Sequence, residues 1–331
     1  MTARAIELAD VEAARQRIRG LAVVTPARHS IGLSRLLGAR VSLKMESMQP
    51  TGAFKLRGAA NAILSLSEEA RQRGIIAQSS GNHGRAVAYV ASQLGIPAVI
   101  CLSRRTPSEK VEAVRALDVE VVVEGGDQME AMDVALSLAE ERGLTVIPPF
   151  DDRHVIAGQG TIGIELLEQC PELETIIVPV SGGGLASGVA MAVKSLRPEL
   201  RVVGVSQENG AAMYESLKAG RLVEVEEEPT WADALAGGLP FDNRWTIDMC
   251  GQWLDEIRLV SEDEIAAAMV YALRHEHIVL EGGAAVGLAL LLTHPTADWG
   301  GNVAVICTGD NVGIDRLLDL VGGETEKETP S

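Results

Sequence analysis

The sequence predicts an α/β fold with two parallel sheets, each covered by helices on both faces to give three layers. Short apolar runs alternate with segments of 3.6-residue apolar spacing, which is typical of parallel sheets packed between helices. Eight runs are too many for one open sheet in a chain of this length, so two sheets fit better. Strands are predicted at residues 41–45, 74–78, 98–102, 119–123, 144–147, 175–180, 201–205 and 302–307.

Helices are predicted between these strands, for example at residues 85–94, 107–117 and 128–142, and an amphipathic helix is expected within residues 1–18. No linker rich in Gly, Ser and Pro marks a domain boundary, so a second domain is expected as an insertion. Residues 45–145 are predicted to form this small domain, and residues 1–44 with 146–321 the large domain. A disordered tail is expected at residues 322–331, which are small, polar and charged.

Composition excludes several classes of function. The chain carries 29 Lys and Arg against 46 Asp and Glu, a net charge of −17 that disfavours nucleic-acid binding. The longest apolar stretch, residues 284–292, is too short to cross a bilayer, and the N-terminus lacks the apolar core of a signal peptide. A cytoplasmic protein without nucleic-acid or membrane partners is predicted. Four buried, unpaired thiols are expected, since the cysteines stand far apart at Cys101, Cys170, Cys250 and Cys307.

The first of four segments with chemical meaning is residues 47–60, SMQPTGAFKLRGAA. Turn residues precede Lys55, which is expected to open a helix. The positive end of the helix dipole disfavours the ammonium form and favours the neutral amine, which attacks carbonyl groups. Lys55 is one of only six lysines. From this segment alone, an ordinary exposed helix residue is the simpler interpretation.

Three further segments run from a strand through small residues into a helix: residues 78–86 (QSSGNHGRA), 178–190 (VPVSGGGLASGVA) and 303–313 (VAVICTGDNVG). Their free backbone N–H groups suit a carboxylate in the first and a phosphate in the second. The glycine segment matches neither the Walker nor the dinucleotide-binding pattern. Thr308 is expected at the carboxyl end of the last strand, where open parallel sheets hold ligands. Each segment alone also fits a cap or a packing turn, and His83 is interpreted as a capping or packing histidine. Together the four segments indicate a phosphorylated, carbonyl-bearing cofactor joined to Lys55.

In this order and spacing the segments closely resemble the fold type II pyridoxal-phosphate enzymes, specifically the serine/threonine dehydratase and serine racemase group. The resemblance covers residues 8–320 and implies the tryptophan synthase β-like fold, pyridoxal 5′-phosphate held by Lys55 as a Schiff base, and a homodimer. Residues 83–117 and 235–246 look most like the hydroxyectoine utilisation dehydratase branch.

The resemblance also implies roles for individual residues. Catalytic roles fall to Lys55 and Ser80. Cofactor contacts are implied for Phe54, Lys55, Asn82, Gly182, Gly183, Gly184, Leu185, Glu281 and Thr308. Substrate contacts are implied for Ser79, Ser80, Gly81, His83 and Gly238. No metal is expected, because Ser206 and Ala212 stand where relatives carry carboxylates. Asp310 replaces a usual glycine, and its side chain is expected to turn outward and cap a helix from Asn311.

The implied reaction removes water and ammonia from a β-hydroxy amino acid, with Lys55 taking the α-proton. The hydroxyectoine branch implies a 3-hydroxylated diaminobutyrate derivative as substrate. L-Threonine or L-serine dehydratase is the nearest alternative. Serine racemase is another, with Ser80 acting on the opposite face of the cofactor, and a β-replacement synthase fits less well. A regulator or inactive paralogue that binds the cofactor without catalysis is the non-enzyme alternative.

Overall fold

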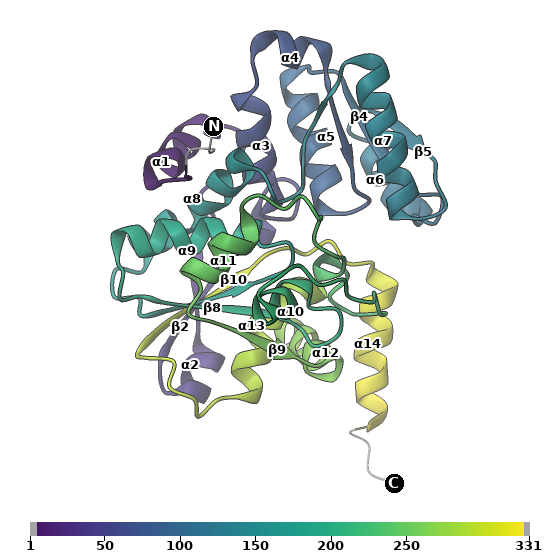
Figure 1. Cartoon of the computed structure of the whole chain (residues 1–331). Coiled ribbons are helices and arrows are strands. Elements are labelled where there is room, and N and C mark those ends of the chain that lie inside the picture. The colour runs from purple at the N-terminus through teal and green to yellow at the C-terminus, as the bar shows by residue number, and fades with distance from the viewer. Residues whose placement is uncertain (1–4, 328–331) are drawn as a thin grey trace.

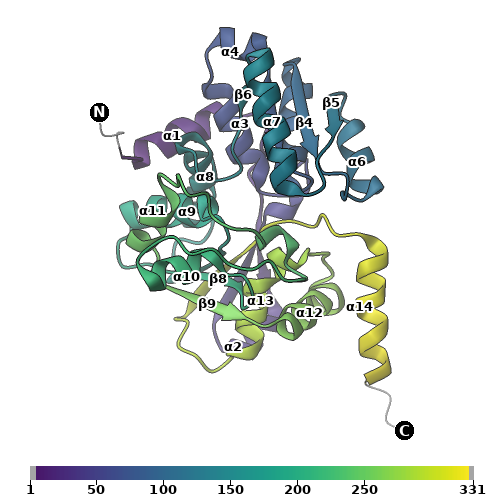
Figure 2. The same ribbon diagram turned by 45° about the vertical axis from the view of Figure 1, so that its right-hand side comes forward.

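The computed structural model describes residues 5–327. Two lobes are visible in Figure 1, with helices α3 to α7 gathered in one and α2, α10, α12 and α13 in the other. Figure 2 shows helix α14 standing at the side of the second lobe. Each lobe contains one sheet, as the sequence predicts.

The larger sheet has six strands in the order β1-β2-β10-β7-β8-β9. All of its neighbouring strands are parallel except β1 and β2, which are antiparallel. The smaller sheet has four parallel strands in the order β5-β4-β3-β6. The strands are β1 Ala27–Ser30, β2 Arg40–Met45, β3 Ile75–Gln78, β4 Ala98–Leu102, β5 Glu120–Val123, β6 Thr145–Val146, β7 Thr175–Pro179, β8 Arg201–Gln207, β9 Glu256–Val260 and β10 Asn302–Cys307.

All eight predicted strands are present, with bounds that differ by at most two residues at either end. Two strands were not predicted. β1 is a short antiparallel edge strand with the polar sequence ARHS, and β9, at the opposite edge, is buried only at Val260. Both are edge strands of the larger sheet in which polar or charged residues interrupt the apolar pattern, whereas β5 and β6, the edge strands of the smaller sheet, lie in apolar runs and were predicted.

The helices cover both sheets. They are α1 Leu8–Arg17, α2 Ile31–Leu37, α3 Lys55–Ser65, α4 Glu68–Arg73, α5 Asn82–Leu94, α6 Ser108–Arg115, α7 Gln128–Arg142, α8 Arg153–Gln169, α9 Gly184–Leu196, α10 Ala212–Ala219, α11 Thr246–Trp253, α12 Glu262–Tyr271, α13 Gly282–Thr293 and α14 Ile314–Lys327. Short turns η1 Glu46–Met48 and η2 Asp233–Leu235 are 3₁₀-helical, and η3 Ala272–Glu276 is a π-helix. The helix predicted at residues 128–142 is confirmed, whereas α5 begins three residues before the predicted start.

The smaller sheet is made only of strands that lie between β2 and β7 in the chain. The predicted division between residues 145 and 146 cuts through β6, which pairs with β3 of this sheet. The chain therefore leaves the smaller sheet only after Val146.

The apolar run at residues 284–292 lies in α13, whose residues from Gly282 to Leu291 are all buried. This helix packs in the main core against β7, β8 and β10, where burying each large aliphatic side chain stabilises the fold by roughly 1.5–3 kcal/mol. Among residues 5–327, the helices fall short of the length and apolar character that a bilayer crossing requires.

The end of the chain differs from expectation. Helix α14 continues to Lys327, so the disorder expected from residue 322 is wrong for residues 322–327. The helix passes through Gly322 and Gly323 although glycine disfavours a helix, because adding a residue to an existing helix costs much less than nucleating a new one. The rest of the expected tail, residues 328–331, lies outside the described residues.

Candidate active site

Lys55 is the first residue of α3, as predicted. Its Nζ donates a hydrogen bond to the carbonyl oxygen of Pro149 at 2.7 Å, and it lies 5.3 Å from the centre of the Phe54 ring. The residue after Pro149 packs on the glycine segment described below. The Pro149 carbonyl is a partner that sequence reasoning did not identify, because it is 94 residues away in the chain.

The amine of Lys55 is poised to lose its proton near neutral pH. Burial lowers the pKa of Lys55 from 10.5 to about 8, although the negative charge of Glu281 acts in the opposite direction. A lowered pKa of Lys55 was expected from the helix dipole, whereas in the structure burial is the largest cause. A neutral amine in a confined site is the form that attacks a carbonyl group.

The glycine segment turns from β7 into α9 around Phe150. A Cβ at Gly182 would lie 2.4 Å from Cδ1 of the Phe150 ring, and a Cβ at Gly184 would lie 2.9 Å from the Cβ of Phe150. Gly183 has a positive φ of 85° and is the N-cap of α9, a helix of 13 residues. The first turn of a helix leaves N–H groups without intrahelical partners, so this junction offers an anion-binding cradle, and Leu185 lies in that turn.

Thr308 follows β10 and meets the start of α3. Its carbonyl oxygen accepts a hydrogen bond from the Phe54 backbone N–H at 3.0 Å, and Gly309 forms a β-bridge with Ala53. Thr308 is buried, and within residues 5–327 its hydroxyl is joined to no hydrogen-bond partner. A hydroxyl of this kind can donate to or accept from a bound ligand.

A chain of polar side chains crosses from α5 to the large lobe at Asn82. Asn82 Nδ2 donates to Glu281 Oε1 at 2.7 Å, and its Oδ1 accepts from Asn311 Nδ2 at 2.6 Å. Arg85 in turn donates to the Asn311 oxygen. A primary amide has two N–H groups, so Asn82 keeps one donor for a ligand. Arg85 and Asn311 stand within the quoted segments, but their pairing could not be predicted from them.

Glu281 is the N-cap of α13 and is buried at the same junction. Burial and the nearby charge of Asp233 raise the pKa of Glu281 to about 7, with a further contribution from Asp310. A Cβ at Gly309 would lie 2.6 Å from Glu281 Oε1, so only glycine fits there without displacing the carboxyl group. Glu281 thus lies against both Asn82 and the loop that carries Thr308.

Four of the five residues with implied substrate contacts, Ser79, Ser80, Gly81 and His83, lie at the start of α5. Ser79 accepts a hydrogen bond from the Gly81 backbone N–H at 3.2 Å, and Ser80 accepts one from Gln128 on α7 at 3.2 Å. Space is open beside Gly81, with no atom within 4 Å of where a Cβ would lie. Gln128 could not be identified from the sequence, because it lies 48 residues after Ser80, at the start of the second helix after α5.

His83 has the packing role that the residues predict. Its ring is buried in the first turn of α5 and donates from Nε2 to the Ile147 carbonyl at 2.8 Å. Burial, together with the charge of Lys55, lowers the pKa of His83 to about 3, so the ring is neutral at physiological pH. A substrate contact by His83 would therefore involve its backbone N–H at the helix start.

Two expectations differ from the structure. Gly238 lies exposed after η2, and within the part of the chain that the structure describes no contact joins it to the other candidate residues. Asp310 does not cap a helix from Asn311, because α14 begins only at Ile314. Its backbone N–H donates to the Gly52 carbonyl at 3.0 Å, and a Cβ at Gly52 would lie 2.5 Å from its carboxyl oxygen.

Ser206 and Ala212, expected to leave a metal site without ligands, are both buried. The Ser206 hydroxyl donates to the side-chain oxygen of Gln207 at 3.0 Å. Among residues 5–327, His, Cys, Asp and Glu side chains form no cluster able to hold a metal ion. The absence of a metal stays a prediction.

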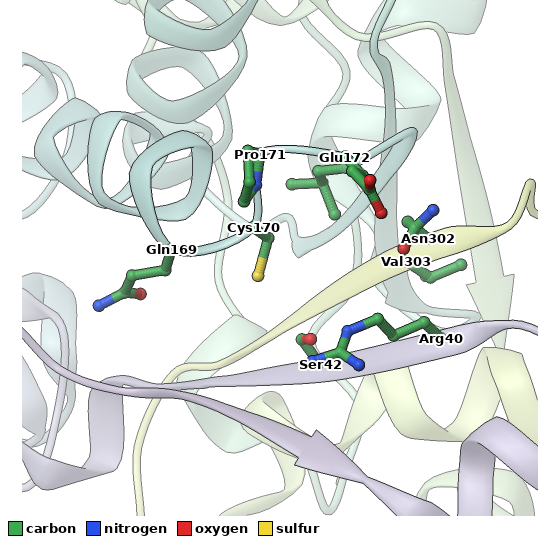
Figure 3. A pocket seen from close by; sticks show the side chains of 9 residues that line it. Arg40, Ser42, Gln169, Cys170, Pro171, Glu172, Asn302 and Val303 are labelled. Carbon is green, nitrogen blue, oxygen red and sulfur yellow. The ribbon is translucent and has the colours of Figure 1, made fainter.

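One cavity adjoins the candidate site and a second lies away from it. One of about 310 Å³ adjoins Glu281 and Asn311, with Lys110, Asp233 and Arg316 at its wall. Figure 3 shows the other, about 220 Å³ in volume, where β2 and β10 begin. It lies at the end of the strands opposite Thr308, and Cys170 lines it. Cys170 is partly exposed, so the expectation of four buried thiols is wrong for this residue alone among the four.

The residues present fit pyridoxal phosphate. The buried Lys55 amine can hold a carbonyl group, the junction at Gly183 can hold a phosphate, and Asn82 and Thr308 each keep a free hydrogen-bonding group. The segment Pro149–Phe150 connects the first two, because Pro149 contacts Lys55 and Phe150 contacts the glycines. An α/β fold with these groups at the carboxyl ends of its strands defines a cofactor-dependent enzyme.

Comparison with known proteins agrees with this class. Residues 18–309 match the family model described as pyridoxal-phosphate dependent enzyme, and the chain belongs to that family. An L-threonine ammonia-lyase of Thermotoga maritima is 42% identical, over 95% of this chain and 78% of that protein.

Solved structures give the same result. Maize serine racemase superposes with a TM-score of 0.90 at 32% identity and covers 98% of this chain and 99% of its own. Threonine deaminase isoform 2 of Solanum lycopersicum has a TM-score of 0.89 at 35% identity, with 95% and 91% covered. The predicted fold type and cofactor are therefore confirmed.

The lowered pKa of Lys55 predicts how capture of the cofactor depends on pH. Below pH 8 the amine is an ammonium ion and cannot attack, so the capture rate should rise through pH 8 and level off above it. Absorbance growth after mixing the cofactor-stripped protein with pyridoxal phosphate at pH 6 to 10 measures this. Nα-acetyl-lysine, which keeps a free side-chain amine, is the control. Its rate of reaction with pyridoxal phosphate should keep rising towards pH 10.5. A midpoint at or above pH 10 in the capture rate of the protein would contradict the prediction.

Proposed function

We propose that this chain is an ammonia-lyase that converts a β-hydroxy amino acid to a keto acid and ammonia, with L-threonine or L-serine as substrate. The similarity to an L-threonine ammonia-lyase carries the proposal, since it extends over 95% of this chain and 78% of that protein. It supports the threonine or serine alternative of the sequence analysis over the hydroxyectoine-derived substrate. L-Threonine would give 2-oxobutanoate and ammonia, the water lost at the β-carbon being regained on hydrolysis.

The site residues fit this reaction. When bound, pyridoxal phosphate withdraws electrons from the α-carbon of an amino acid and so makes its proton acidic. Lys55 is the base in this proposal, because an amine with a pKa of about 8 can take that proton and return it near neutral pH. The Ser79–Gly81 turn and the backbone N–H groups that open α5 bind the substrate carboxylate.

Asn82, Glu281 and Thr308 hold the cofactor ring in this proposal, and the glycine segment with Leu185 holds its phosphate. The free hydroxyl of Thr308 carries no charge, unlike a carboxylate, and so does not enforce protonation of a pyridine nitrogen. We infer that this favours early elimination over prolonged carbanion reactions. A homodimer is proposed from the resemblance to the family, and the cytoplasmic location expected from the sequence stays a prediction.

A hydroxyectoine-derived 3-hydroxy-diaminobutyrate compound is the second candidate substrate. The specific observation in its favour is the likeness of residues 83–117 and 235–246 to that branch. In the structure these residues form α5, β4, α6 and the approach to α11, which lie in both lobes. Serine racemase activity is a third possibility, with Ser80 as the second acid or base.

A substrate screen tests the proposal. The cofactor-loaded protein should release ammonia and keto acid in equal amounts from L-threonine or L-serine, measured by coupled assays. Release confined to the diaminobutyrate compound would select the second candidate. α-Proton exchange with formation of D-serine and little ammonia would select the racemase. A protein that binds the cofactor but acts on none of these would be the inactive paralogue.

A further inference from the structure

A buried network of ion pairs joins α3, the helix that begins with Lys55, to three neighbouring elements. It contains two cations, Lys44 and Arg57, and two carboxylates, Glu46 and Glu165, whose side chains are at most 2% exposed. They come from β2, α3, η1 and α8, so four elements meet at one neutral cluster. The proposed reaction uses none of these side chains.

Arg57 is the centre of the network. Its Nε and Nη2 donate to the two carboxylate oxygens of Glu46, both at 2.8 Å. Its Nη1 and Nη2 donate to the two oxygens of Glu165 at 2.7 and 2.8 Å. A planar guanidinium can bind two carboxylates in this way, whereas a lysine ammonium of the same charge cannot.

The remaining groups of the network are also satisfied. Lys44 Nζ donates to Glu165 Oε2 and to the Thr25 carbonyl, each at 2.6 Å. It also donates to Gln169 Oε1 at 3.1 Å, and Gln169 lines the cavity of Figure 3. Burial alone would raise the pKa of Glu46, but the charge and hydrogen bonds of Arg57 outweigh burial and leave it below its usual value.

Stability alone does not explain the network. Taking charges out of water costs about as much as their attraction returns, and apolar replacements of buried ion networks are often equally stable. The location of Arg57 gives a different reason. It stands two residues after Lys55, in the first turn of α3, and its partner Glu165 belongs to α8, the helix that follows Pro149 in the chain.

We propose that Arg57 is a positioning residue for Lys55: by binding Glu46 and Glu165 together, it fixes the first turn of α3 so that the Lys55 amine stays against the Pro149 carbonyl. The inference rests on the proposed role of Lys55 in holding the cofactor, and not on the identity of the substrate. Glu281 and His83 are the titratable groups that face Lys55, and both stay unchanged in the test below.

The substitution Arg57→Lys keeps the positive charge and removes the paired hydrogen bonds of the guanidinium to Glu46 and Glu165. We expect a folded protein in which water reaches the Lys55 amine, so that its pKa rises towards 10.5. The pH profile of cofactor capture should shift upward by about half a pH unit or more, a threefold change in the proton affinity of Lys55. The loaded protein should also lose its visible band several times faster on transfer to cofactor-free buffer. Arg15→Lys is the matched control, because Arg15 makes the same double contact with Glu168 at the surface, at 2.6 and 2.5 Å, and should change neither readout.

Arg57→Lys with a lower melting temperature but an unchanged profile and unchanged retention of the band would overturn the inference and leave Arg57 a purely structural residue. If Arg57→Lys does not fold, Glu165→Gln decides by the same two measurements, since it keeps the shape and removes one charge of the network. Absence of any band in the unsubstituted protein would instead refute the proposed function, and the positioning role with it.

Discussion

Replacing Lys55 with alanine is expected to remove ammonia release and the visible absorbance band while leaving the fold intact. Burial brings the pKa of the Lys55 amine to about 8, and proton transfer by a positioned base contributes roughly 10²- to 10⁴-fold to a rate. Loss of the attachment point adds to this effect. The melting temperature should change little, because the substitution removes a single hydrogen bond, the one to the Pro149 carbonyl.

Lys218→Ala is the control for this experiment. Lys218 lies on α10, where its ammonium group lies over the Tyr214 ring at 5.5 Å, away from the residues of the site. Both variants are compared by coupled ammonia assay, absorbance spectrum and thermal melt. Ammonia release by Lys55→Ala at more than a tenth of the rate of the unsubstituted protein would show that another group is the base.

The central strands of both sheets could be predicted because their burial leaves a clear sequence signal. Val303, Val305 and Ile306 of β10 form an apolar run that only a strand buried on both faces carries. β1 and β9 left no such run, because polar and charged residues interrupt both strands. β5 and β6 lie at the edges of the smaller sheet and were predicted all the same, so the apolar run, and not the position in the sheet, decided which strands were predictable.

Prediction of the site has a similar limit. Lys55 and the glycine segment could be identified because each has a local signal, a helix start or a run of glycines. Pro149, Asn311 and Gln128 could not, since each reaches the site through packing with segments 48 to 229 residues away. Burial of Lys55, which lowers its pKa more than a helix dipole explains, is likewise a property of the assembled lobes.

Gly183→Ala is expected to weaken both the fold and cofactor binding. Gly183 has a φ of 85°, a conformation that costs an alanine about 1 kcal/mol. The added Cβ would also lie 2.7 Å from Met213 Cε and 2.9 Å from Thr246 Cβ, and such overpacking costs roughly 1–3 kcal/mol. Relief of the contact moves the turn that opens α9, so the affinity for pyridoxal phosphate should fall roughly ten- to a hundredfold, equivalent to about 1.4–2.7 kcal/mol.

Gly220→Ala separates the two causes. Gly220 ends α10 with a φ of 64°, but no atom lies within 4 Å of where its Cβ would be, so this variant bears the backbone strain without the clash. It should lose about 1 kcal/mol of unfolding free energy and keep its cofactor affinity. Denaturant unfolding and titration with pyridoxal phosphate measure the two quantities. Equal cofactor affinity in Gly183→Ala and Gly220→Ala would mean that the glycine segment packs the lobe together and does not hold the phosphate, because only the first substitution changes the start of α9.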